Sequence, residues 1–257
     1  MRTAIQLYTL RHLDEPLPDT ITRVGETEFD GVEIAGLDDR APADVAAALE
    51  EAGLDVMAAH VGLGVLEDDL DGTVETYRDL GCDHLVVPWT DPADLATREG
   101  AESVAHRLAD VGERVRDHGL DFSSHNHDQE FRDVGGEPAF HVFAREAPDL
   151  TFEVDAGWVL AGGHDPTCLI REYGDRVPLV HCKDVLVDAN REPGETDVFT
   201  TDAHQPVELG EGDLDLAGVL EAAREAGTEW ACYEHDFPGD PVASLEHGSD
   251  LLTDLVG

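Results

Sequence analysis

Eight apolar runs of strand length alternate with amphipathic segments of helix length along the whole chain. Several helical segments stop at a glycine just before the next apolar run, as expected of βα units in series. Eight such units in 257 residues predict an α/β fold, the (β/α)8 TIM barrel. A doubly wound open sheet is the alternative, but no glycine-rich phosphate fingerprint follows the first strand. The strands are expected at residues 4–8, 31–34, 55–60, 84–89, 120–125, 150–155, 177–183 and 229–235.

The helical segment 42–52 shows the repeating unit most clearly, because its alanine-rich sequence ends at Gly53, a residue suited to a helix stop. Gly81, Gly119 and Gly227 are expected to end helices in the same way. One long irregular stretch, 185–213, follows the seventh strand and is predicted to lie over the barrel mouth as a lid or rim. No linker or composition break interrupts the pattern, so residues 1–257 are expected to form a single domain.

The formal net charge is −42, with 58 acidic residues spread along the chain against 16 basic ones. At about 1 M salt the screening length falls to about 3 Å, which makes so acidic a surface tolerable. The composition therefore predicts a halophilic protein of a salt-rich cytoplasm, and it argues against nucleic-acid binding. The chain starts with a strand-like run rather than a secretory signal, and no apolar run of membrane-spanning length occurs.

Cysteine usage indicates buried reduced thiols rather than a structural zinc site. The four cysteines form no CxxC pair, and three of them stand in or beside strand-like apolar runs. They are Cys82, Cys168, Cys182 and Cys232.

Lys183 is the only lysine, since the other fifteen basic residues are arginines. It follows His181 at the end of the predicted seventh strand and precedes Asp184. A lysine supplies a flexible point charge where arginine supplies a planar fork, so its survival here suggests a functional requirement for an ammonium group.

Polar side chains gather at the ends of the predicted strands. In a parallel barrel the carboxyl ends of all strands surround one mouth, so these residues are expected to converge although they are distant in sequence. They are rich in carboxylates and imidazoles, and they comprise Glu33, His60, Trp89, His125, His127, Asp155, His181, Lys183, Glu234 and His235.

Three of these residues have the chemistry of metal ligands. Asp155, His181 and Glu234 lie at the ends of the sixth, seventh and eighth predicted strands, and neighbouring strands are about 4.8 Å apart. Mixed carboxylate and imidazole ligands suit a divalent metal ion, Mn²⁺, Mg²⁺, Co²⁺ or Zn²⁺. The fourth ligand stays open between His125, at the end of the fifth strand, and Glu130, just beyond it.

The chain resembles the sugar phosphate isomerase/epimerase group of the xylose isomerase-like TIM barrels. The resemblance covers nearly the whole chain, with seven short motifs in the expected order. The matching segments are 31–33, 59–63, 125–131, 153–158, 181–184, 210–212 and 234–236.

This resemblance implies a metal ion held by Asp155, His181, Glu234 and a residue of the fifth strand, and substrate hydroxyls bound by Glu33, His60 and Lys183. The chain departs from the epimerases at the fifth strand, where they carry glutamate before asparagine and this chain carries His125 before Asn126. A proton shuttle between two bases would therefore need His125 or Glu130 in place of the second glutamate. The same superfamily includes inosose dehydratases and lyases of oxidised sugars, so elimination is the alternative to epimerisation.

The chemistry expected of such a site is removal of a proton next to a carbonyl, with a metal ion stabilising the enediolate. Glu234 is predicted to serve as ligand and base, with His125 or Glu130 opposite, and Lys183 to hold an anionic oxygen. His127 is placed among the substrate-binding residues.

Trp89 and Trp158 are either sugar-stacking residues or rim packing. The substrate is expected to be a small carbohydrate. Two further hypotheses remain. The first is an endonuclease-type phosphodiesterase, which is disfavoured because the scattered arginines form no basic DNA-binding face. The second is a barrel that binds a sugar without turnover. A homo-oligomer is compatible with the sequence.

Overall fold

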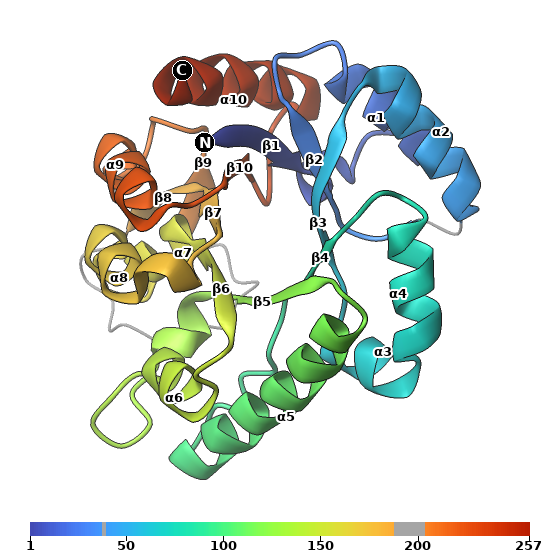
Figure 1. Ribbon diagram of the computed structural model, residues 1–257. Coiled ribbons are helices and arrows are strands. Elements are labelled where there is room, and N and C mark those ends of the chain that lie inside the picture. The colour runs from blue at the N-terminus through green and yellow to red at the C-terminus, as the bar shows by residue number, and fades with distance from the viewer. Residues whose placement is uncertain (38–39, 188–203) are drawn as a thin grey trace.

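In a computed structural model, which describes residues 1–37, 40–187 and 204–257, eight parallel strands close into a barrel (Figure 1). The predicted (β/α)8 TIM barrel is confirmed. The strands run around the barrel in the order β1, β10, β7, β6, β5, β4, β3, β2. Their bounds are β1 Arg2–Gln6, β2 Gly31–Ile34, β3 Asp55–His60, β4 His84–Val87, β5 Asp121–His125, β6 Thr151–Asp155, β7 Leu179–Cys182 and β10 Trp230–Tyr233.

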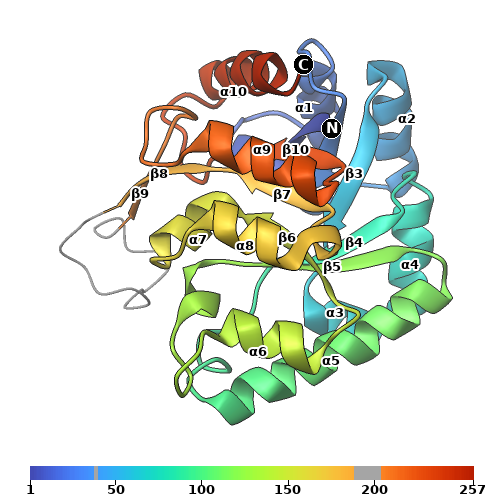
Figure 2. The same ribbon diagram turned by 60° about the vertical axis from the view of Figure 1, so that its left-hand side comes forward.

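Helices surround this barrel (Figures 1 and 2). Their apolar side chains join those of the strands in the main hydrophobic core. The α-helices are α1 Leu17–Val24, α2 Pro42–Ala52, α3 Leu63–Asp68, α4 Leu70–Arg78, α5 Arg98–Asp117, α6 Ala139–Glu146, α7 Ala156–Ala161, α8 Pro166–Tyr173, α9 Leu216–Ala226 and α10 Pro241–Val256. Three short 3-10 helices complete the set: η1 Leu7–Leu10, η2 Asp128–Phe131 and η3 Gly174–Arg176. At the end of α2, Gly53 adopts a left-handed conformation with φ 71°, so the predicted glycine stop is present.

The predicted seventh strand ends one residue early, at Cys182, and Lys183 stands between β7 and a new strand, β8 Asp184–Val187. β8 pairs antiparallel with β9 His204–Val207, so the stretch predicted to be irregular contains a two-stranded sheet. The middle of that stretch, 188–203, lies outside the described residues. The eighth barrel strand ends at Tyr233, which puts Glu234 in the segment just beyond it.

The interior of the barrel is apolar at one end and polar at the other. A small cluster with Met57, Leu179 and Trp230 fills the amino-terminal end. Because inward-facing residues recur every second position, Leu179 is followed inward by His181, and Trp230 by Cys232 and then Glu234. The polar residues at the strand ends therefore lie next to an apolar cluster that fills the other end of the barrel.

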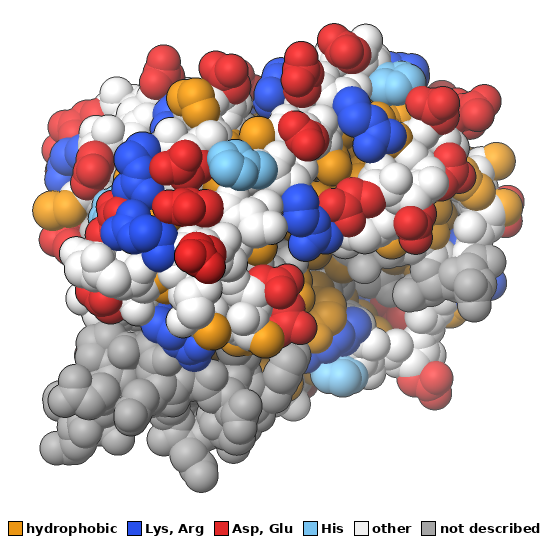
Figure 3. Space-filling view, turned by 90° about the horizontal axis from the view of Figure 1, so that it is seen from below, with side chains coloured by type: hydrophobic (Ala, Val, Ile, Leu, Met, Phe, Trp, Pro, Cys, Tyr) orange, Lys and Arg blue, Asp and Glu red, His pale blue; other side chains and the backbone are white. Residues whose placement is uncertain are grey.

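Acidic side chains are scattered over the face seen from below, with arginines among them (Figure 3). All four cysteines are free thiols, and only Cys168 among them is exposed. Among the described residues, no helix is long and apolar enough to cross a membrane.

Candidate metal and active site

Four buried side chains meet at the carboxyl-terminal mouth of the barrel: His125, Asp155, His181 and Glu234. Each offers one ligand atom, and these four atoms lie within 4.8 Å of one another. The strand register explains the convergence, because His181 is the Cα partner of Asp155 on one side and of Cys232 on the other. Glu234 follows Cys232 on the same face of the chain.

The distances inside this ligand group fit a common divalent ion. His181 Nδ1 lies 2.8 Å from Glu234 Oε2 and 3.9 Å from Asp155 Oδ2, and His125 Nε2 lies 3.5 Å from the same Asp155 oxygen. Ligand atoms about 2.1 Å from one tetrahedral ion are separated by about 3.4 Å. In the described part of the chain, both ring nitrogens of His125 are buried and make no hydrogen bond, which is costly for polar atoms unless a partner is bound.

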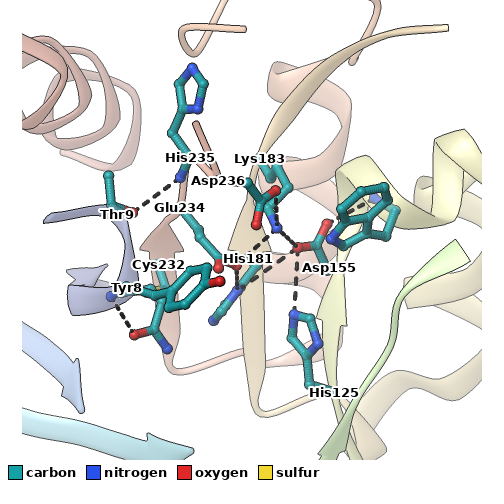
Figure 4. Close-up of polar contacts among 12 residues, drawn as sticks. Tyr8, Thr9, His125, Asp155, His181, Lys183, Cys232, Glu234, His235 and Asp236 are labelled. Atoms are coloured by element: carbon teal, nitrogen blue, oxygen red, sulfur yellow. Dashed lines mark hydrogen bonds and ion pairs between the residues drawn. The ribbon is translucent and has the colours of Figure 1, made fainter. Parts of the chain in front are cut away.

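Lys183 supplies a positive charge among three carboxylates at the mouth of the barrel. Its ammonium, 1% exposed, lies 2.9 Å from Asp236 Oδ2, 3.1 Å from Glu234 Oε2 and 3.2 Å from Asp155 Oδ2 (Figure 4). Burial lowers the pKa of Lys183, but the three carboxylates outweigh burial and raise it above its ordinary value. The only lysine of the chain is therefore a buried, permanently charged group.

Glu234 is held as a carboxylate. Burial raises its pKa, but the charge of Lys183 and the hydrogen bond from His181 bring the pKa well below its usual range. His127 is the opposite case, since burial and the nearby His125 and Lys183 lower its pKa well below the ordinary value. The mouth thus contains an anionic acceptor and a neutral imidazole.

A cavity of about 430 Å³ opens above the ligand group. Its size suits a small organic ligand. The Trp89 and His127 rings meet edge to face at 4.8 Å, and His127 lies 5.5 Å from the Trp158 ring. The cavity is lined by Tyr8, Ala35, His60, Gly62, Pro88, Trp89, His125, His127, Trp158, Glu234, Asp236 and Phe237.

Of the predicted substrate-binding residues, His60, Trp89, His127 and Trp158 line this cavity, whereas Glu33 does not. Glu33 is fully buried beneath the ligand group. It forms a second group there with His60, Glu153 and His181. Burial lowers the pKa of His60, but the Glu33 and Glu153 carboxylates raise it to about 10.

At the fifth strand the structure brings His125 into the ligand group and leaves Glu130 outside it. Glu130 stands in η2, where its Oε2 accepts a hydrogen bond from the backbone N–H of His127 at 2.9 Å. Burial raises the pKa of Glu130 to about 8, although two backbone N–H groups oppose the shift. Its carboxyl closes the turn after β5 instead of facing the other ligands.

Sequence reasoning assigned no role to Asp236, Glu153 and Gln6, all of which contact the site. Glu153 precedes Asp155 by two positions in β6, so strand alternation alone could have placed it inside the barrel. Asp236 follows Glu234 by two positions, so the alternation that directs Glu234 to the mouth could have placed Asp236 there as well.

The family model described as xylose isomerase-like TIM barrel matches residues 21–255. Among curated proteins, the chain is 26% identical over 237 residues to the rhizopine catabolism protein MocC of Rhizobium meliloti, covering 83% of this chain and 72% of that protein. These matches span most of the chain.

Three solved structures share the fold. A sugar phosphate isomerase/epimerase of Parabacteroides distasonis matches with TM-score 0.80 and 18% identity over 100% of both chains. The probable 3-DHS dehydratase AsbF of Bacillus anthracis matches with TM-score 0.77 and 14% identity, covering 98% of this chain and 99% of its own. The IolI protein with a bound zinc atom matches with TM-score 0.77 and 15% identity, covering 100% of this chain and 98% of its own. The chain belongs to the xylose isomerase-like TIM barrel family.

Proposed function

We propose that the protein is a divalent-metal-dependent isomerase or epimerase that moves a proton next to the carbonyl of a sugar or keto-sugar. The observation that carries this proposal is the position of Glu234, a carboxylate held ionised beside Lys183, within the ligand group and at the wall of the cavity. A carboxylate in that place can take a proton from a bound substrate.

The ligand group supports a resident metal ion, Mn²⁺, Mg²⁺, Co²⁺ or Zn²⁺. Asp155, His181 and Glu234 would hold it, since they supply two carboxylates and an imidazole and no thiolate, and His125 stands beside them either as the fourth ligand or as the acid of the reaction. When bound, the ion supplies a Lewis acid that stabilises negative charge on neighbouring oxygens.

Side chains of the protein would carry out proton transfer, substrate binding and exclusion of water. In an epimerisation, Glu234 takes the proton from one side of the carbon, and a protonated ring nitrogen of His125 delivers a different proton to the other side. His125 then acts as the acid and is not a ligand of the metal ion. Lys183 holds its ammonium near the oxygen that becomes anionic, and His60 and His127 bind hydroxyls at the cavity wall. Trp89 and Trp158 exclude water from the reacting carbon and pack on the apolar face of the sugar.

A dehydratase or lyase acting on an inosose or oxidised sugar is the second candidate, and His125 is the observation that favours it. Elimination needs an acid that protonates the leaving hydroxyl, and a ring N–H of His125 can donate a proton where an ionised glutamate cannot. In this role His125 does not hold the metal ion, which would be held by Asp155, His181 and Glu234. Both candidates begin with the same proton removal by Glu234.

The test is a panel of keto-sugars and inososes with Mn²⁺ in molar KCl, followed by NMR for deuterium incorporation from solvent. Glu234→Gln should reduce exchange by roughly 10²–10⁴-fold while the fold is retained. Glu229→Gln is the matched control. Glu229 is exposed and directly precedes the first residue of β10, so this substitution should leave exchange unchanged. Near-normal exchange by Glu234→Gln would refute the assignment of the base.

Product analysis separates the candidates. An epimer with retained mass supports epimerisation, and an unsaturated ketone with loss of water supports elimination. If the purified protein carries no divalent ion and its melting temperature does not rise on addition of Mn²⁺, the result would favour a barrel that binds a sugar without turnover. Nicking of abasic-site DNA would favour the endonuclease reading.

The acidic composition supports a halophilic protein of a salt-rich cytoplasm. Counter-ions screen the repulsion of the net charge of −42, so the melting temperature should rise steeply between about 0.1 and 1 M KCl. An unchanged melting temperature over that range would argue against salt adaptation.

A further inference from the structure

His181 spans two layers of the barrel interior. Its Nδ1 faces the ligand group, where it lies 2.8 Å from Glu234 Oε2. Its Nε2 faces downward, 2.8 Å from Glu33 Oε2 and 3.3 Å from Glu153 Oε1. All of these side chains are buried, so water does not compete for either nitrogen.

An imidazole that binds a metal ion through Nδ1 must leave that nitrogen unprotonated and carry its proton on Nε2. The hydrogen-bond partner of the second nitrogen decides which of the two tautomers is present. A carboxylate at Nε2 can only accept, so it favours the tautomer that presents the Nδ1 lone pair to the ion.

Glu33 is better placed for this task than Glu153. The side-chain amide of Gln6 donates to the same Glu33 Oε2 at 2.6 Å and thereby fixes the orientation of that carboxylate. Glu153 directs its Oε2 to His60 Nε2 at 2.8 Å and is 3.3 Å from His181 only through Oε1. Each lower carboxylate thus has its own principal imidazole partner.

We propose that Glu33 is a positioning residue, which accepts the Nε2–H of His181 and so presents Nδ1 to the divalent ion, and is not a substrate-binding residue. This inference rests on the proposed function, because it assumes that a metal ion occupies the ligand group. It replaces the hydroxyl-binding role expected for Glu33, whose side chain lies below the cavity wall and not in it.

A second metal ion between Glu33, His60, Glu153 and His181 is the rival explanation of the lower group. His181 could then ligate both ions only as an imidazolate, with no proton on either nitrogen. Metal analysis distinguishes the two, because the positioning role requires one ion per chain and the rival requires two.

The experiment compares the full-length wild-type protein with Glu33→Gln and Glu33→Leu. Each is stripped of metal and titrated with Mn²⁺ or Zn²⁺ against a chelator. Glu33→Leu should weaken metal binding roughly 10–100-fold, and Glu33→Gln, which keeps an acceptor oxygen but loses the charge, should weaken it less. Glu153→Leu is the matched control and should cause a smaller loss than Glu33→Leu. Far-UV circular dichroism of the metal-free proteins verifies that each variant is folded, and Glu33→Gln serves if Glu33→Leu does not fold.

Nitrogen-15 NMR of histidine-labelled protein provides a readout that is independent of activity. The His181 signals, assigned by their loss in His181→Gln, should show Nε2 protonated and Nδ1 bound to Zn²⁺ in the wild-type protein. In the Zn²⁺-bound state, Glu33→Gln should shift the Nε2 signal, because a neutral amide oxygen is a weaker acceptor of the Nε2 proton than a carboxylate.

The outcomes separate this inference from the proposed function. A wild-type protein that binds no divalent ion overturns both. One bound ion in the wild-type protein, together with unchanged metal affinity and a raised KM in Glu33→Gln, overturns only the positioning role and restores substrate binding. Two bound ions in the wild-type protein also overturn it.

Discussion

Asp155 and His181 are direct Cα partners in the parallel register of β6 and β7, so two ligands from different βα units lie side by side at one barrel edge. The next pairing, of His181 with Cys232 in β10, brings Glu234 to the same edge two positions later. Three neighbouring strands therefore deliver three potential ligands through backbone pairing alone. Metal binding should consequently depend on intact strand register and should stabilise the barrel.

Removal of divalent metal should lower the stability of the wild-type protein. An ion present at 100 times its dissociation constant stabilises the folded state by about 2.7 kcal/mol, so chelation should produce a loss of that order. Asp155→Asn should abolish the response to chelator, whereas Asp121→Asn, at the exposed start of β5, should retain it. Calorimetric melting with and without EDTA measures the effect, and equal responses of the two variants would contradict the ligand assignment.

Metal affinity should also weaken as the pH falls. Burial lowers the pKa of His181, but the carboxylates of Glu153 and Glu33 outweigh burial and raise it well above the ordinary range. An ion must therefore displace a proton from His181, and acid favours the proton. Titration with Mn²⁺ at several pH values should show proton release on binding; pH-independent affinity would contradict this prediction.

Loss of the single lysine should destabilise the protein strongly. Lys183→Met leaves Asp155, Glu234 and Asp236 facing one another without their cation, and breaking a buried ion pair costs about 3–5 kcal/mol. Urea denaturation of the metal-free protein at constant KCl measures the change. Arg40→Met, which removes an exposed cation, is the control, and similar free energies of unfolding for the two variants would contradict a buried structural charge.

Gly212 should tolerate no side chain. A Cβ at this position would lie 2.1 Å from Asp184 Oδ1, whose carboxylate accepts backbone N–H groups from Val185, Gly210, Gly212 and Leu214. Gly212→Ala should cost about 1–3 kcal/mol because the carboxylate must move. Gly239→Ala, which meets no atom within 4 Å, should be near neutral in the same urea denaturation experiment. Equal effects would show that the Asp184 cluster is not rigid.

Glu130 should make stability fall as the pH rises. Its pKa is raised from 4.5 to about 8 by burial, so between these values the folded state keeps a proton that the unfolded chain releases. The contribution is complete below pH 4.5 and lost by about pH 8. Glu130→Gln mimics the protonated acid, so its advantage over the wild-type protein should grow across this window to on the order of 5 kcal/mol.

Denaturation at several pH values tests this prediction for Glu130. Glu113→Gln, an exposed position on α5, supplies the control and should show no such growth. A constant difference between Glu130→Gln and the wild-type protein would mean that Glu130 is ionised in the folded state.

The sequence predicted the strands well because alternation and glycine stops are local signals. It also predicted the meeting of Asp155, His181 and Glu234, since each stands at or directly after a strand end. His125 closes β5, so its inward direction follows from alternation with Ser123. Glu130 lies in η2, where the hydrogen bond to His127 sets its direction, and no periodic pattern reports that bond.

The amino-acid sequence by itself determined the barrel and the set of polar residues at its mouth, because hydrophobic periodicity and strand polarity suffice for both. Only the tertiary structure decided the height of each residue within the barrel. Parallel strands in a barrel are staggered, and the register between β2 and β3 shifts between Val32 and Glu33, so a residue near a strand end can lie below its neighbours. Glu33 lies against His181 Nε2 and not at the cavity wall, and this position depends on its contact with β7, which is distant from β2 in the chain.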